Sequence, residues 1–131
     1  MPVEELQGPF KDKSKMAHKL VRPVVHLFTK RDCHLCDVVK AVMASSTIPH
    51  EVVMVNITLP GRRAWFDKYK YDIPVLYING QYMAKHRITK ESFEETARRI
   101  MAGEKIPQAI LAEDPNPDLP IGPLPDTSDP L

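Results

Sequence analysis

The residues best suited to covalent chemistry in this sequence are its only two cysteines, Cys33 and Cys36. An apolar run and a short basic loop precede them, and a helical pattern follows. With Cys33 at the start of that helix, its sulfur faces unpaired N–H groups and the positive end of the helix dipole. That environment favours the thiolate, which is the nucleophile in disulfide exchange. We therefore interpret Cys33 as an attacking thiol and Cys36, one turn on, as the resolving thiol.

Charged side chains around Cys33 act on the same thiolate. Lys30 and Arg31 stabilise it, as does His34 when protonated. Asp32 opposes them. Each exposed charge contributes under ~1 kcal/mol because water and salt screen it, so we expect the helix terminus to contribute more than any side chain. Arg31 and His34 are tuning residues in this interpretation. Flanked by these charges, the cysteines are badly placed to be inert core residues.

Metal binding is a second chemistry open to the same two cysteines. Two thiolates at this spacing make half of a tetrahedral zinc or iron–sulfur site. The chain has no second cysteine pair, so a full site needs a dimer, glutathione or a distant histidine. His18, His50 and His86 show no ligand spacing to Cys33, and we assign no metal ligands. His26 lies in an apolar run, and we interpret it as a hydrogen-bonded core residue.

Length and charge limit the organisation and the partners of the chain. Its 131 residues suffice for one packed domain without disulfide staples. The net charge is +1, and no face or helix concentrates the bases, which argues against nucleic-acid binding. No segment approaches the roughly 18 apolar residues of a membrane span. The N-terminus resembles neither a secretory signal nor a good mitochondrial presequence. We expect a cytoplasmic monomer, with the mitochondrion as the alternative location.

Hydrophobic periodicity predicts alternating strands and helices around the cysteines. An unbroken apolar run predicts a buried strand over residues 24–28. A helix follows Cys33 and ends near residues 44–46. The apolar stripe of this helix consists of Leu35, Val38, Val39, Val42 and Met43. A β-branched strand over residues 52–57 completes a right-handed parallel βαβ unit.

A shorter helix and a hairpin are predicted next. The dipeptide Pro60-Gly61 opens the helix, with the proline in its first turn. Its apolar side, which we expect to be core, consists of Trp65, Phe66 and Tyr69. Asn79-Gly80 between strands over residues 75–78 and 81–87 is the strongest short signal for a two-residue type I′ turn.

The last predicted helix carries signals at both ends. Thr89 is the N-cap with Ser92 as a capping partner, and Ile88 and Phe93 form a hydrophobic staple. Gly103 ends the helix. The predicted element order is therefore β-α-β-α-β-β-α.

This order, with C-x-x-C at the first helix and a proline before the third strand, resembles the thioredoxin fold. Within that fold the chain resembles the glutaredoxin-like domain proteins. The resemblance covers about residues 23–103 and rests on Thr29-Lys30-x-x-Cys33-x-x-Cys36, Ile73-Pro74 and the Asn79-Gly80 hairpin. It implies an α/β domain with a mixed four-stranded sheet and helices on both faces. It also implies a thiol-disulfide oxidoreductase that acts on protein or small-molecule disulfides, with glutathione as the candidate co-substrate and no firm cofactor.

The resemblance further assigns substrate-binding roles. In this family the proline after the second helix is cis and faces the cysteine pair. Its position leaves the preceding backbone free to pair with a bound thiol peptide. Pro74 takes that place, with Ile73 as the backbone partner. Lys30 matches a lysine that in glutaredoxins pairs with a glutathione carboxylate.

Two differences from glutaredoxins bear on glutathione. His34-Leu35 stands where they usually have Pro-Tyr. Ala84-Lys85 and Ile88 replace a Gly-Gly pair and an Asp that receive the γ-glutamyl end. We therefore expect weak glutathione binding. An adapter that keeps the fold without turnover stays open as an alternative.

The segments outside the domain have a different composition. We expect residues 1–22 to be a flexible arm and residues 104–131 to be a disordered tail. The tail holds seven prolines and cannot bury enough apolar surface to fold. Five acids and no base lie in residues 113–131. We expect any contact of these acids with basic residues of the domain to be weak, because salt screens exposed pairs. The basic residues considered are Lys30, Arg31, Arg62 and Arg63.

Overall fold

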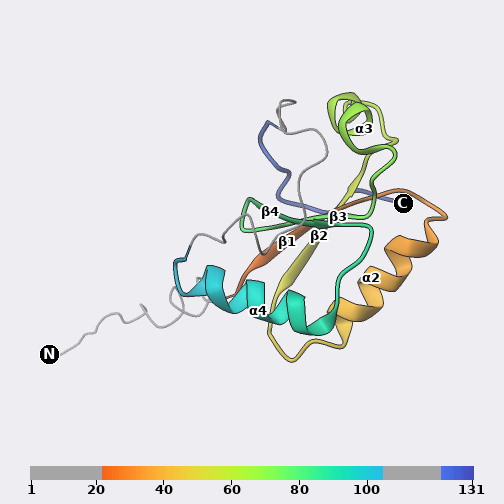
Figure 1. Cartoon of the computed structure of the whole chain (residues 1–131). Coiled ribbons are helices and arrows are strands. Elements are labelled where there is room, and N and C mark those ends of the chain that lie inside the picture. Colours follow the sequence, from red (N-terminus) through yellow and green to blue (C-terminus); the bar gives the residue numbers. More distant parts are fainter. Residues whose placement is uncertain (1–21, 105–121) are drawn as a thin grey trace, which may run out of the picture.

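The structure, a computed structural model, describes residues 22–104 and 122–131 (Figure 1). Almost all of the predicted arm lies outside the described residues. The elements are β1 (Val24–Thr29), α2 (His34–Ala44), β2 (Glu51–Asn56), α3 (Arg63–Tyr69), β3 (Val75–Ile78), β4 (Gln81–Lys85) and α4 (Lys90–Met101). The predicted order of strands and helices is confirmed, as is the α/β architecture.

The four strands form one mixed sheet with the order β2-β1-β3-β4. β1 and β2 are parallel, whereas β1–β3 and β3–β4 are antiparallel. Asn79 and Gly80 join β3 to β4 with φ values of 48° and 81°. Positive φ at both central residues is what a type I′ turn requires, so this prediction is confirmed. β2 lies at one edge of the sheet.

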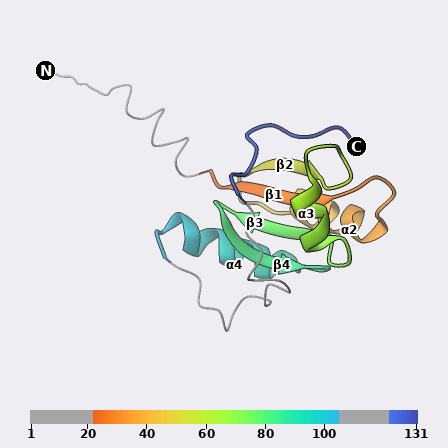
Figure 2. The same cartoon turned by 90° about the horizontal axis from the view of Figure 1, so that it is seen from above.

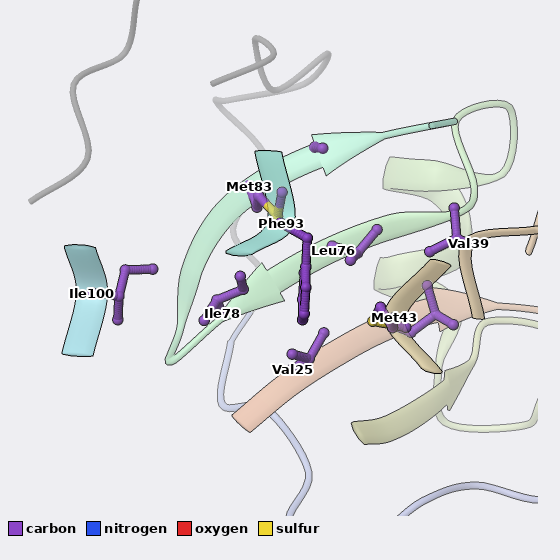
Figure 3. Packing of buried hydrophobic residues seen from close by; sticks show 10 residues of the cluster. Val25, Val39, Met43, Leu76, Ile78, Met83, Phe93 and Ile100 are labelled. Atoms are coloured by element: carbon purple, nitrogen blue, oxygen red, sulfur yellow. The ribbon is translucent and has the colours of Figure 1, made fainter. Parts of the chain in front are cut away.

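Helices cover both faces of the sheet, α2 and α4 on one side and α3 on the other (Figures 1 and 2). Successive strand residues point to opposite faces, so each strand contributes to both layers. Under α2 and α4, Phe93 and Met43 point toward Val25 and Leu76 of the sheet (Figure 3). The layer under α3 is built around Phe28, Trp65 and Tyr69, which confirms that Trp65 and Tyr69 are core residues.

Two details of the helices differ from the sequence-based expectation. α3 begins at Arg63 rather than at Pro60, because Gly61 has a φ of 87° and cannot belong to a right-handed helix. On α2, Val39 and Met43 are buried, but Leu35 and Val38 are 40% and 46% exposed. The apolar stripe of α2 is therefore wider than the face that meets the sheet.

The ends of α4 follow the sequence signals closely. The Thr89 hydroxyl accepts a hydrogen bond from the Ser92 N–H, and the Ser92 hydroxyl oxygen accepts one from the Thr89 N–H. Gly103 lies just after the helix with a φ of 84°. Farther along α4, the carboxylate of Glu94 accepts hydrogen bonds from the loop between α2 and β2. These bonds hold the pKa of Glu94 below its usual range.

The expectation of a solvated tail does not describe residues 122–131. This segment, called the strap below, crosses the α3 face and then follows the outer edge of β2 (Figure 2). Leu124 packs against the cluster that contains Phe28. The main-chain oxygen of Pro125 lies 2.7 Å from Nε2 of the buried His26. Tail composition did not indicate these contacts, because they depend on complementary groups far away along the chain. Residues 105–121 lie outside the described part.

Candidate functional site

The cysteine pair lies at the junction between β1 and α2. The cysteine loop, residues 30–33, connects the two elements. Asp32 has a φ of 59°, a left-handed conformation that a short polar residue tolerates, and it turns the chain into the helix. Cys33 is consequently the N-cap residue of α2, as the motif predicted.

Cys33 and Cys36 form a disulfide, with their Cα atoms 5.2 Å apart. The Cys33 sulfur also accepts a hydrogen bond from the Cys36 N–H at 3.2 Å. This is the bond that an N-cap side chain makes to the unpaired donors of a first turn. The donor belongs to the backbone of α2, so it is fixed in place for a sulfur at this position.

The two cysteine side chains differ in their access to solvent. Cys36 is 1% exposed and belongs to the buried cluster around Phe28. Cys33 is half-buried and packs against the outside of that cluster. A disulfide in solution must therefore approach the pair from the Cys33 side. The roles of an attacking and a resolving thiol stay predictions.

The basic residues predicted around Cys33 lie at the surface. Lys30 and His34 are both exposed. Arg31 is also exposed, but its Nη2 donates a hydrogen bond to the main-chain oxygen of Leu131 at 2.9 Å. The cysteine loop is thus tied to the strap at Arg31, one of the four basic residues considered for a contact with the tail, although the acceptor is a main-chain oxygen and not an acid.

Ile73 and Pro74 stand at the start of β3 beside the same cluster. The peptide bond between them is cis, as the family resemblance implied. Ile73 is part of the cluster against which Cys33 packs. Its N–H donates to the Tyr69 carbonyl at 3.2 Å, and the same carbonyl accepts the Asp72 N–H at 2.8 Å. The expected free backbone at Ile73 is therefore partly engaged, and a peptide pairing with this N–H must replace its 3.2 Å bond.

Aromatic rings of the buried layer under α3 pack around the site. Phe28, at the end of β1, makes edge contacts with Trp65 and Tyr69 of α3, with ring centroids 5.4 Å and 5.3 Å apart. The hydroxyl groups of Tyr69 and Tyr77 lie 2.6 Å apart in the buried layer. Because a buried hydroxyl needs a hydrogen-bond partner, this pair fixes α3 against β3.

The positions that hold the γ-glutamyl dock in glutaredoxins carry other chemistry here. Ala84 is buried in the sheet, and the Lys85 amine lies 3.5 Å from the Asp72 carboxylate. Ile88 is partly buried against the core under α4. A methyl group, an ion-paired amine and an apolar side chain thus occupy the places of two glycines and an acid.

A pocket of about 390 Å³ opens between the cysteine loop and the strap. Its walls come from the loop, the end of β2 and the strap, so no local sequence pattern could reveal it. The lining residues are Arg31, Asn56, Thr58, Leu59, Pro130 and Leu131.

Neither a metal centre nor a membrane-spanning helix is found in residues 22–104 and 122–131. No three His, Cys, Asp or Glu side chains gather there as a metal-ligand group. No helix within these ranges is long and apolar enough to cross a membrane. The Nε2–H of His26 donates a hydrogen bond to the main-chain oxygen of Pro125 in the strap, which confirms the prediction of a hydrogen-bonded core histidine.

Comparison with known families matches residues 24–96 to the glutaredoxin-like domain (DUF836). The chain belongs to this family. The matched part of this glutaredoxin-like protein contains both cysteines, Ile73-Pro74 and the Asn79-Gly80 turn, so the resemblance based on those motifs is confirmed. The match ends within α4, and the strap lies beyond it.

Proposed function

We propose that this glutaredoxin-like protein is a thiol-disulfide oxidoreductase in which Cys33 attacks and Cys36 resolves. One observation carries the proposal: a single disulfide joins a half-buried N-cap sulfur to a fully buried one. The family and the fixed N–H beside the Cys33 sulfur support it. The helix terminus stabilises the Cys33 thiolate, with smaller contributions from Arg31 and His34.

The proposed exchange consists of two successive attacks by thiolates. The Cys33 thiolate attacks one sulfur of a substrate disulfide, and the other substrate sulfur leaves as a thiolate that takes up a proton. Deprotonated Cys36 then attacks the Cys33 sulfur. This step forms the Cys33–Cys36 disulfide and releases the second substrate thiol. The substrate is reduced by two electrons, and the protein is oxidised by two.

Glutathione is the proposed reductant of the protein disulfide. Two glutathione molecules return the pair to the dithiol through a mixed disulfide at Cys33. Lys30 supplies a cation for a glutathione carboxylate, and the backbone at Ile73-Pro74 supplies a pairing edge. Because other side chains occupy the dock positions, binding is weak and turnover is below that of an ordinary glutaredoxin.

Trapping tests the assignment of the two thiols. Cys36→Ser should leave a mixed disulfide at Cys33 that accumulates with a protein or glutathione disulfide and is resolved by dithiothreitol. Cys33→Ser is the matched control and should trap nothing, because its remaining thiol is buried. Mass spectrometry of the intact protein reads both results. Equal trapping by the two variants would refute the roles, and no trapping by either would favour a non-catalytic adapter.

A further inference from the structure

The outer edge of β2 is occupied by the strap without forming a regular ladder. The Asp129 N–H donates to the Met54 carbonyl at 2.8 Å. The Met54 N–H donates to the Ser128 hydroxyl oxygen at 3.0 Å, and the Asn56 N–H donates to the Asp129 carboxylate at 3.0 Å. Side chains of the strap therefore satisfy edge donors that a fifth strand would normally pair through its carbonyls.

Asp129 is the most specific contact of the strap. The Arg62 guanidinium binds its carboxylate through two hydrogen bonds of 2.9 Å and 2.7 Å. The same guanidinium lies over the Trp65 ring, 5.1 Å from its centroid. The carboxylate is only 10% exposed. The paired hydrogen bonds raise the pKa of Arg62 and lower that of Asp129. A planar, stacked guanidinium of this kind selects a carboxylate by shape as well as by charge.

The neighbours of Asp129 add to this selection. The Asn56 side-chain amide donates to the Pro130 carbonyl at 2.9 Å. Pro130 itself has no N–H, so a segment with proline here covers the edge and cannot extend a ladder. Consecutive groups of the tripeptide Ser-Asp-Pro thus each meet a partner on β2 or at the start of α3.

We propose that the outer edge of β2, together with Arg62 and Trp65, is a docking site for extended protein segments that carry Ser-Asp-Pro. The strap is the ligand that the chain itself provides. Addition of an extended segment to a sheet edge is a general mode of peptide recognition, in which main-chain bonds give affinity and side-chain contacts give specificity. A tethered segment reaches an effective concentration on the order of millimolar, so a partner segment binds only where the strap is released.

The position of the site relates it to the cysteine loop without depending on redox chemistry. Leu131 follows the tripeptide directly and contacts Arg31, two residues before Cys33. A partner segment that docks in the same direction takes the place of Pro130 and Leu131 beside Arg31. The site therefore brings a bound protein next to the cysteine pair.

Peptide binding to full-length variants tests the site. The probe is a labelled decapeptide with the sequence of residues 122–131, Gly-Pro-Leu-Pro-Asp-Thr-Ser-Asp-Pro-Leu, followed by fluorescence anisotropy. Asp129→Asn in the protein weakens the intramolecular contact, so this variant should bind the peptide at least about tenfold more tightly than the wild type. A peptide with Asn in place of its second Asp should bind Asp129→Asn at least about tenfold more weakly than the probe does. Equal affinity of the probe for both proteins, or no binding to Asp129→Asn, would overturn the proposal.

Matched variants locate the binding. Added to Asp129→Asn, Arg62→Gln should abolish peptide binding, whereas Arg63→Gln should preserve it because Arg63 is exposed and pairs with Asp67. The amide signals of Met54 and Asn56 should shift on binding. Ser128→Ala, a gentler release of the strap, should also increase binding, and circular dichroism checks that each variant is folded. Peptide binding that survives Arg62→Gln would place the ligand elsewhere and refute the site.

Discussion

The cysteine loop and the strap meet at Arg31, yet they are built in opposite ways. In the loop, the hydrogen bond that fixes the Cys33 sulfur joins residues three apart. The polar contacts of the strap join residues 67 to 100 positions apart. The position of the Cys33 sulfur comes from the local geometry of a helix start, and the position of the strap comes from side chains that the folded sheet brings together.

The two regions are therefore vulnerable to different substitutions. The N-terminus of α2 keeps its geometry as long as α2 is folded. The proposed chemistry of Cys33 therefore depends mainly on the core against which α2 packs. The strap depends on one ion pair and on edge hydrogen bonds that water can replace. We therefore expect core substitutions to affect both regions and polar substitutions to affect only one.

Phe28→Ala should produce the largest effect on stability. Phe28 is fully buried and supports the cluster that contacts both Cys33 and Leu124. Loss of a buried phenylalanine typically lowers the free energy of unfolding by about 3–5 kcal/mol. Denaturant unfolding measures this loss, and amide exchange should show weaker protection in α2 and along β2 together.

The control for Phe28→Ala is Phe66→Ala, which removes a half-buried ring from α3. It should cost much less and should leave the cysteine loop protected. If Phe28→Ala weakened the strap and left the loop unchanged, the two regions would not share a supporting core.

The same contrast explains how much the sequence could predict. The cysteines, the turn at Asn79-Gly80 and the cap at Thr89 are local signals, and each was located correctly. Gly61 was misread because a Pro-Gly pair suits both a helix start and the turn before one.

The sequence suggested only a weak, screened contact of the tail with residues that include Arg31 and Arg62, and the ordered strap was missed for a non-local reason. High proline and acid content indicates that a segment cannot build its own core. It says nothing about a fit to an edge that β2, Arg62 and Trp65 form together. The partial engagement of the Ile73 N–H was missed similarly, because it depends on how α3 ends against β3.

Acid should weaken the contact between Arg62 and Asp129 that holds the strap. The hydrogen bonds from Arg62, with a further one from the Asn56 N–H, depress the pKa of Asp129 in the folded state. The resulting stabilisation is fully present above the pKa of an unfolded aspartate, about 3.9, and is lost as the pH falls through the lower folded value. At pH 7 we expect Asp129→Asn to lower the free energy of unfolding by about 1–2 kcal/mol.

That difference should shrink as the pH falls through the folded pKa of Asp129, because the wild-type carboxyl is then neutral too. Urea unfolding of both proteins at several pH values measures it, and Glu94, whose pKa is also lowered, is present in both and cancels. Asp126→Asn is the matched control, since Asp126 is exposed on the same segment. A difference that stayed constant down to pH 2 would show that the Arg62–Asp129 charge pair does not hold the strap.

The smallest expected effect distinguishes the two adjacent cations of the loop. Lys30 is exposed, whereas Arg31 holds the Leu131 oxygen. An exposed ion pair contributes under ~1 kcal/mol, which is less than about fivefold in affinity. Lys30→Ala should therefore raise the KM for glutathione by about two- to fivefold, leave kcat nearly unchanged and reduce the salt dependence of KM.

Lys40→Ala, in which the lost amine pairs with Asp37 on α2, should change none of these values. Arg31→Ala should change KM less than Lys30→Ala does, because the strap already engages that guanidinium. Should both loop variants raise KM equally, Arg31 would be as available to substrate as Lys30, and the strap would not restrain the cysteine loop.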